Sequence, residues 1–247
     1  MAAIIELTSA SSNLEAYLTS WTSGFQTSYG AFWDEGAGLV TNPVAGTTYE
    51  QWGNGTAGSK GIYLEGEVQY ARGNLTGTVD TITLGSGFSQ SNASGFSVSA
   101  ELVITPDSTI PGAGQDSFDW AIYDLTVNGS LSSFYDYLGE VGTVIEDTTA
   151  SNVLVGFSGA DTFVFSGGVD TVKAGPAGTY GYQDGTDTLD VSAWGASSVD
   201  DIYWYDDTDG YAVIGSVTDA SVGITLVGVS SSVLDVSDFI FAPALAA

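Results

Sequence analysis

Tyr70 and Arg72 are the two residues of this sequence whose types and spacing point to a ligand site. They lie two positions apart near the end of an apolar strand pattern, so both side chains fall on one strand face. A phenol ordinarily loses its proton with a pKa of ~10, and a nearby cation such as the Arg72 guanidinium lowers that pKa. The alternative is that Tyr70 belongs to the core and keeps its hydroxyl at the rim.

The sequence contains neither cysteine nor histidine, which excludes several kinds of chemistry. Disulfides, thiolate metal sites and cysteine nucleophiles need cysteine, while serine triads, zinc hydrolases and histidine-ligated haem need histidine. Glu65 and Glu67 share a strand face, but that face is opposite the apolar one, which is typical of a solvated surface. Because no nucleophile or base stands in a recognisable pattern, we do not expect an enzyme.

The chain is strongly acidic. Its 247 residues include 30 acidic and three basic ones, which gives a formal net charge of −27. A field of that sign repels nucleic acid and anionic lipid, so neither is an expected partner. No apolar run approaches the ~20 residues that span a bilayer, so we expect no membrane insertion.

A predicted hairpin over residues 61–88 must position Tyr70. In its first strand apolar residues alternate with polar ones, the period-two pattern of a half-buried strand. The apolar face holds Ile62, Leu64, Val68 and Tyr70. Residues 72–74 form the predicted turn. The return strand changes face between Val79 and Ile82, which predicts a β-bulge there.

Helices are predicted before and after the strands of this first region. An apolar stripe and the capping-box spacing of Ser12 and Glu15 predict a helix over residues 12–25. Alternation predicts an inward-facing strand over 96–105, and residues 120–127 predict another. A turn at Asn128-Gly129 leads into a second helix. This order predicts an α+β domain over residues 1–147, with helices on one face of an antiparallel sheet.

Composition changes near Glu146. From Thr148 onwards every acidic residue is Asp, and Lys173 is the only basic residue. Short β-rich runs recur between turn residues, at 161–165, 188–191, 202–205, 211–217 and 223–229. This pattern predicts an all-β domain over residues 148–247.

The first domain resembles the secreted haem-acquisition proteins, or hemophores. The matching segments are SNLEAYLTSWTSGF, GNLTGTVDTITLGSGF and WAIYDLTVNGSLSSFYDYL, in order and spacing. The resemblance implies a strongly curved sheet with helices on its concave side, and haem held by a His and a strand Tyr. Tyr70 matches the strand Tyr, with Arg72 as its cationic neighbour. The family's histidines have no counterpart here.

The second domain resembles the C-terminal part of calcium-binding RTX proteins and serralysin-type proteases. The matching segments are LVGFSGADTFVFSGGVDTV, DGTDTLDVSAWG, ITLVGV and DVSDFIF. The resemblance implies calcium sites, and the candidate ligands are Asp161, Asp170, Asp184 and Asp187. The alternative is that these are solvated turn aspartates. Because one degraded repeat is visible, a full parallel roll is not expected.

Both resemblances favour an extracellular protein. The N-terminus lacks the pattern of a secretory signal peptide. The C-terminal DVSDFIFAPALAA looks like the uncleaved signal of type I secretion, so the type I secretion machinery is an expected partner. The alternative is an ordinary last strand over residues 236–241, and the two interpretations are compatible.

Two functions remain open. The first is a self-assembling subunit of a filament or surface layer, possible because the chain is rich in Gly, Ser, Thr and aromatic residues and low in total charge density. In this hypothesis calcium promotes assembly, and the Ile4-Ile5 segment docks into a neighbouring copy. The second is a haem binder that uses Tyr70. The sequence ranks assembly slightly above haem binding.

Overall fold

The protein is described by a computed structural model that covers residues 2–25, 28–71, 74–106 and 117–243. It divides into two compact units. The first unit is Met1–Ile5 with Leu18–Tyr137, and the second is Glu6–Tyr17 with Leu138–Ala247. The domain boundary near residue 147 was placed from composition and stays a prediction.

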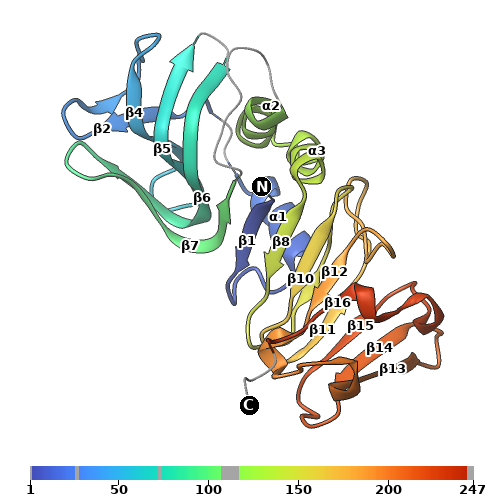
Figure 1. Cartoon of the computed structure of the whole chain (residues 1–247). Coiled ribbons are helices and arrows are strands. Elements are labelled where there is room, and N and C mark those ends of the chain that lie inside the picture. Colours follow the sequence, from blue (N-terminus) through green and yellow to red (C-terminus); the bar gives the residue numbers. More distant parts are fainter. Residues whose placement is uncertain (1, 26–27, 72–73, 107–116, 244–247) are drawn as a thin grey trace. The chain divides into compact units, whose positions relative to one another are not determined.

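An antiparallel sheet forms most of the first unit. Its strands are β2 (Ala31–Asp34), β3 (Gly38–Val40), β4 (Thr48–Gly55), β5 (Gly61–Ala71), β6 (Asn74–Ser91) and β7 (Gly95–Thr105). They lie in the order β7-β6-β5-β4-β2-β3. The long strands β6 and β7 bend strongly along their length (Figure 1). Together with the helices of the chain, this sheet confirms the predicted α+β class.

The β5–β6 hairpin agrees with the sequence prediction. Ile62, Leu64 and Val68 are fully buried on one face of β5. The pairing register shifts between Glu65 and Gly66, so that Asp80 of β6 has no partner in β5. This is the predicted bulge, and it explains why the apolar face changes between Val79 and Ile82.

Strand β7 departs from the predicted alternation at Ala100, which is exposed although it was expected to face inward. Its register against β6 shifts between Leu84 and Gly85, so that Glu101 has no paired residue. Such a bulge rotates the residues on one side of it relative to the other, so Leu102 and Ile104 are buried while Ala100 is not.

The first predicted helix forms as α1 (Leu14–Ser23). Its cap is not the predicted Ser12 but Asn13, whose Oδ1 accepts a hydrogen bond from the Ala16 amide at 3.1 Å. The second predicted helix forms as α3 (Ser132–Val141).

Residues 120–127 are helical, so the predicted strand there is wrong. They belong to α2 (Ser117–Tyr123) and a π-helical turn, Asp124–Asn128, which ends at Gly129 in the left-handed region with φ 66°. The buried residues of this segment recur at helical spacing and are Phe118, Ala121, Ile122 and Leu125. The short apolar run fits a strand as well as a helix until this spacing is counted.

The second unit contains a parallel coil whose successive strands alternate between two sheets. One sheet holds β8 (Thr143–Glu146), β10 (Asp161–Val164), β12 (Thr188–Asp190) and β16 (Phe239–Ile240), paired in parallel in that order. In the other, β9 (Val153–Leu154) and β15 (Gly223–Leu226) pair in parallel with β11 (Val169–Val172). Because the sequence shows one degraded repeat, we did not expect a parallel roll. The parallel pairing of these strands corrects that expectation.

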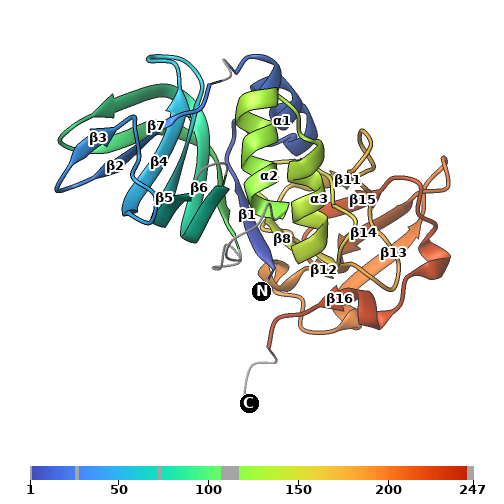
Figure 2. The same ribbon diagram turned by 90° about the horizontal axis from the view of Figure 1, so that it is seen from above.

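The second sheet continues with antiparallel strands. β14 (Ala212–Ser216) pairs with β15 on one side and with β13 (Ile202–Asp206) on the other. Strand β13 is the last of this sheet. Figure 2 shows β13, β14 and β15 side by side in orange and red. The prediction of a β-rich second region is confirmed.

The N-terminal strand β1 (Ala3–Leu7) belongs to the chain's own sheet, with Ala3 and Ile5 buried. The hypothesis that Ile4 and Ile5 dock into another copy is therefore wrong for the structure described, because their strand is already paired. No helix in the described ranges is long and apolar enough to cross a membrane.

Candidate functional site

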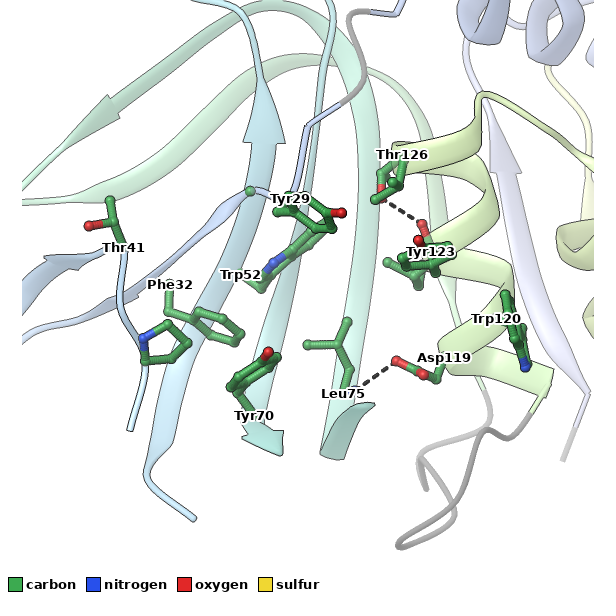
Figure 3. Close-up of a pocket in the computed structure, with 14 residues that line it drawn as sticks. Tyr29, Phe32, Thr41, Trp52, Tyr70, Leu75, Asp119, Trp120, Tyr123 and Thr126 are labelled. Carbon is green, nitrogen blue, oxygen red and sulfur yellow. Dashed lines mark hydrogen bonds between the residues drawn. The ribbon is translucent and has the colours of Figure 1, made fainter. Parts of the chain in front are cut away.

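A pocket of about 440 Å³ lies in the first unit between the sheet and α2 (Figure 3). The sheet side comes from β2, β4, β5, β6, the segment before β2 and the segment after β3. The other side comes from α2 and the π-helical turn. The lining residues are Tyr29, Gly30, Phe32, Thr41, Pro43, Trp52, Tyr70, Leu75, Asp119, Trp120, Ile122, Tyr123, Thr126 and Val127. Six of these fourteen residues are aromatic, and a lining rich in apolar and aromatic side chains is usual for small-molecule sites.

Tyr70 lies in this pocket and is half-buried. Its ring packs against Phe32 with the centroids 5.8 Å apart and the planes at 58°. Its hydroxyl points into the space among Phe32, Trp52 and Leu75 (Figure 3). Within the described residues this hydroxyl has no hydrogen-bond partner. The predicted neighbour Arg72 lies outside the described residues.

Gly30 allows the chain to pass close to Trp52. Its φ is +71°, and a Cβ placed there would lie 2.7 Å from both the Trp52 ring and the Gly53 carbonyl oxygen. Only glycine fits such a close approach with this backbone conformation. The indole of Trp52, which is itself buried, therefore forms a fixed wall of the pocket.

Asp119 fastens α2 to the hairpin. Its side chain is 7% exposed, and its Oδ1 accepts a hydrogen bond from the Leu75 amide at 2.7 Å. Pairing between β6 and β7 begins only at Ile82, so this part of β6 has no β7 partner. The Asp119 carboxylate thus supplies an acceptor for the Leu75 amide at this strand edge. Without it, that buried amide would lack this hydrogen bond.

Trp120 and Tyr123 form the rim of the pocket on α2. Their rings meet edge to face, with centroids 5.5 Å apart and planes at 89°. Both are partly exposed, and Tyr29 on the opposite rim is largely exposed. Large exposed aromatic side chains next to a cavity are typical of a binding surface.

Two of the candidate calcium ligands, Asp161 and Asp187, are buried with both carboxylate oxygens hydrogen bonded to the chain. Asp161 accepts from the Thr143 amide at 3.1 Å and from the Phe157 amide at 2.6 Å. Asp187 accepts from the amides of Asp161 and Gln183. These carboxylates join successive turns of the coil through amides and do not fit a cation as arranged. Burial raises the pKa of both, Asp187 to about 6.

The other two candidates differ from this pattern. Asp184 is exposed in a turn. Asp170 is fully buried, and its Oδ1 accepts from the Asn152 amide at 2.7 Å, while its Oδ2 has no partner in the described part of the chain. Asp147, which we did not predict as a site residue, faces it. Burial raises the pKa of Asp147 to about 6 and that of Asp170 to about 7, and the Asp147 charge adds to the second shift.

The strand pattern placed Tyr70 on the face that lines the pocket, but the α2 side of the pocket was not predicted. Asp119, Trp120 and Tyr123 were assigned to a strand or left unassigned, so they could not be placed opposite Tyr70. The helical spacing of Phe118, Ile122 and their buried neighbours was the signal that could have found them.

No protein-family model and no curated protein sequence matches the chain. Among solved structures, the apo hemophore HasA from Yersinia pestis is 13% identical, with a TM-score of 0.44, covering 56% of this chain and 86% of that one. The holo form is 15% identical with a TM-score of 0.43, covering 55% and 87%.

The AlgE6R2 subunit of the Azotobacter vinelandii mannuronan C5-epimerase is also similar to part of the chain. It is 25% identical with a TM-score of 0.31, covering 43% of this chain and 74% of that one. A likeness this low carries no functional conclusion, so the geometry of the pocket and of the coil must supply it.

Proposed function

We propose that the pocket of the first unit binds a planar, largely apolar ligand, and specifically haem with the Tyr70 oxygen as iron ligand. The observation that carries the proposal is the Tyr70 hydroxyl, which points into an aromatic cavity without a hydrogen-bond partner in the described ranges. A core tyrosine would be expected to satisfy its hydroxyl. This observation favours ligand binding over assembly and so reverses the order that the sequence suggested.

The residues around Tyr70 fit the flat ligand as well as its metal. A phenolate oxygen is a suitable ligand for ferric iron, the centre that haem supplies when bound. Phe32 and Trp52 offer apolar ring surface on the sheet side, and Trp120 and Tyr123 could cover the ligand from α2. The volume lies in the usual range for small-molecule pockets, about 300–1,000 Å³.

The test compares haemin with metal-free protoporphyrin, using quenching of the protein's tryptophan fluorescence, because two of its six tryptophans, Trp52 and Trp120, line the pocket. If iron ligation by Tyr70 contributes, haemin binds more tightly than the metal-free ring, and Tyr70→Phe removes that difference. Equal affinities for the two rings that Tyr70→Phe leaves unchanged would support an apolar pocket but contradict ligation. Absence of saturable binding by either ring would contradict the proposal as a whole.

Assembly remains a second candidate because of strand β13. It is the edge of its sheet, and Tyr203 and Tyr205 on it are 45% and 51% exposed. Their rings stack with centroids 6.1 Å apart, and Tyr203 lies against Gly215, where a Cβ would be 2.4 Å from its hydroxyl. An exposed edge that carries aromatic side chains can pair with another copy.

Assembly is tested by light scattering over a concentration series, with and without calcium. Because copies with a charge of −27 repel each other, assembly through β13 should strengthen with salt or calcium. Replacing Tyr203 and Tyr205 by serine should abolish it, while Tyr180→Ser, an exposed tyrosine away from this edge, should not. Assembly that survives the double replacement would contradict this interface.

We further propose that the protein acts outside the cell after type I secretion. The support is the C-terminal sequence pattern. In the structure its first part forms a short 3-10 turn, Val236–Asp238, followed by β16, while residues 244–247 lie outside the described residues. Replacing the last residues by a charged sequence should retain the protein inside cells that carry the secretion machinery. Unchanged export would contradict this proposal.

A further inference from the structure

We propose that the outward face of the five-stranded sheet in the second unit binds an uncharged, extended polysaccharide. The site is independent of the aromatic pocket of the first unit. Its basis is a pair of exposed and nearly parallel tyrosine rings on a sheet face that carries no charged side chain. Tyr203 and Tyr205 of β13 are the residues that would contact the sugar rings.

The pairing register determines which side chains share a face with the two tyrosines. Residues that lie directly opposite each other in neighbouring strands point to the same side of a sheet. The opposite pairs that start at the tyrosines continue through β14 and β15 to β11. We call the surface formed by these positions the tyrosine face. Its side chains are Tyr203, Tyr205, Val213, Thr225, Thr171 and Val169, and its other two positions are glycines.

The tyrosine face is open to solvent. The alternate residues of the same strands form the core, where Ile214 and Ile224 are not exposed at all. On the tyrosine face, Tyr203 is 45%, Tyr205 51% and Val169 54% exposed. Three large aromatic or apolar side chains thus lie exposed on one face of one sheet, which is typical of an interaction surface.

Gly215 allows the Tyr203 ring to lie across the neighbouring strand. The two residues are opposite each other, and a Cβ on Gly215 would be 2.6 Å from Tyr203 Cζ and 3.1 Å from its Cε1. The Tyr205 ring follows at 6.1 Å between centroids, with its plane at 18° to the first. Because the planes are almost parallel, the rings form one aromatic surface, and their spacing is close to the length of one sugar unit in a polysaccharide.

A sugar ring fits this surface through its C–H groups. The face of an aromatic ring is electron-rich, so it attracts the slightly positive hydrogens on the apolar side of a pyranose ring. Thr171 and Thr225 lie opposite each other on the same face. Their hydroxyls make no hydrogen bond within the described residues, so they are available to the hydroxyls at the edge of the sugar.

Charge selects an uncharged polymer. None of the eight positions of the tyrosine face is Asp, Glu, Lys or Arg, although the chain has a net charge of −27. An acidic polysaccharide would meet no cation on this face and would be repelled by the field of the chain. A neutral polymer avoids that repulsion, whereas a second copy of the chain would bring another charge of −27 to the face.

The size of the face suits a polymer better than a single sugar. Neighbouring strands lie about 4.8 Å apart, so the three steps from β13 to β11 span about 14 Å. One sugar unit would cover only one of the tyrosine rings. The Tyr203 ring is already packed on Gly215, so binding costs little further loss of its conformational freedom.

The experiment is isothermal titration calorimetry of the full chain with three polysaccharides. Hydroxyethylcellulose and galactomannan are the neutral probes, and carboxymethylcellulose offers an anionic polymer on the same backbone as the first. We expect saturable binding of at least one neutral polymer and no binding of the anionic one. Tyr203→Ala and Tyr205→Ala should each lower the affinity about tenfold, because each removes one aromatic contact. Tyr180→Ala, which removes an exposed tyrosine elsewhere in the second unit, should leave it unchanged.

Two further variants separate the loss of a ring from the loss of the fold. Tyr203→Phe and Tyr205→Phe keep both rings in place, so they should retain binding and the melting temperature of the unchanged protein. The proposal is overturned if neither neutral polymer binds, if carboxymethylcellulose binds as tightly as hydroxyethylcellulose, or if both alanine variants bind normally. Light scattering that shows self-association lost in the alanine variants, with no polysaccharide bound by the unchanged protein, would assign the face to a second copy and would also overturn it.

Discussion

Replacing Asp119 by alanine should destabilise the first unit and weaken its pocket together. The side chain is buried and accepts the Leu75 amide at 2.7 Å, so the replacement leaves that amide without this charged acceptor. A hydrogen bond to a charged group contributes about 1.5–3 kcal/mol. With a urea dependence of about 2 kcal/mol/M, a loss of about 2 kcal/mol lowers the unfolding midpoint by about 1 M.

The assay follows urea unfolding by tryptophan fluorescence and ligand binding on the same samples. Asp136→Ala is the matched control, since Asp136 is an exposed helical aspartate and the change in charge is identical. Asp119→Asn should lose less, because its amide oxygen can still accept from Leu75. If Asp119→Ala unfolds at the same urea concentration as Asp136→Ala, the idea that this carboxylate fastens α2 to the hairpin is refuted.

Three other predictions concern the pocket and the coil. Gly30→Ala should reduce stability and ligand affinity more than Gly46→Ala. Both glycines have positive φ, but only at Gly30 would a Cβ meet the Trp52 ring. Urea unfolding of the two variants measures the difference in stability. Affinity for haemin, an anion, should rise when sodium chloride increases from 20 to 500 mM, because salt screens the charge of −27; a fall would contradict this. In calcium-free buffer, the melting temperature should decrease as pH rises from about 4 to 7.5. Burial raises the pKa of Asp147 to about 6 and that of Asp170 to about 7, so the folded state holds protons that the unfolded chain releases; a rise over this range would refute it.

The hairpin that carries Tyr70 could be predicted because its information is local. Alternation of apolar and polar residues determines which face of a strand is buried, and the change of face at Asp80 reveals the bulge. Tyr70 was placed correctly on the apolar face for the same reason. Whether its hydroxyl meets the core or a cavity depends on residues distant in sequence, so the strand pattern alone left both alternatives open.

The opposite wall could not be predicted with the same method. The segment 120–127 is short, and over such a length an apolar run fits both the two-residue period of a strand and the 3.6-residue period of a helix. The capping residue of α1 shows a similar limit, because Ser12 and Asn13 are both good caps and the chain uses Asn13.

The coil of the second unit was hidden for another reason. Its turns bring together residues 18 positions apart where Asp161 meets Thr143, but an insertion extends the next step to 26 positions at Asp187. A changing period conceals a repeat from inspection of one sequence. The coil's buried aspartates Asp161, Asp170 and Asp187 stood out in the sequence. The groups that donate hydrogen bonds to them are mostly backbone amides, which have no sequence signature.

The measurement that tests the central claim most directly is an absorbance titration of the protein with haemin, compared among the unchanged protein, Tyr70→Phe and Tyr63→Phe. Tyr63 is on the same strand but on the face opposite the pocket, so its replacement removes an identical hydroxyl elsewhere. We predict one-to-one binding with a shifted haem spectrum that Tyr63→Phe preserves and Tyr70→Phe loses. A spectrum and affinity that Tyr70→Phe leaves unchanged would contradict the assignment of Tyr70 as the iron ligand.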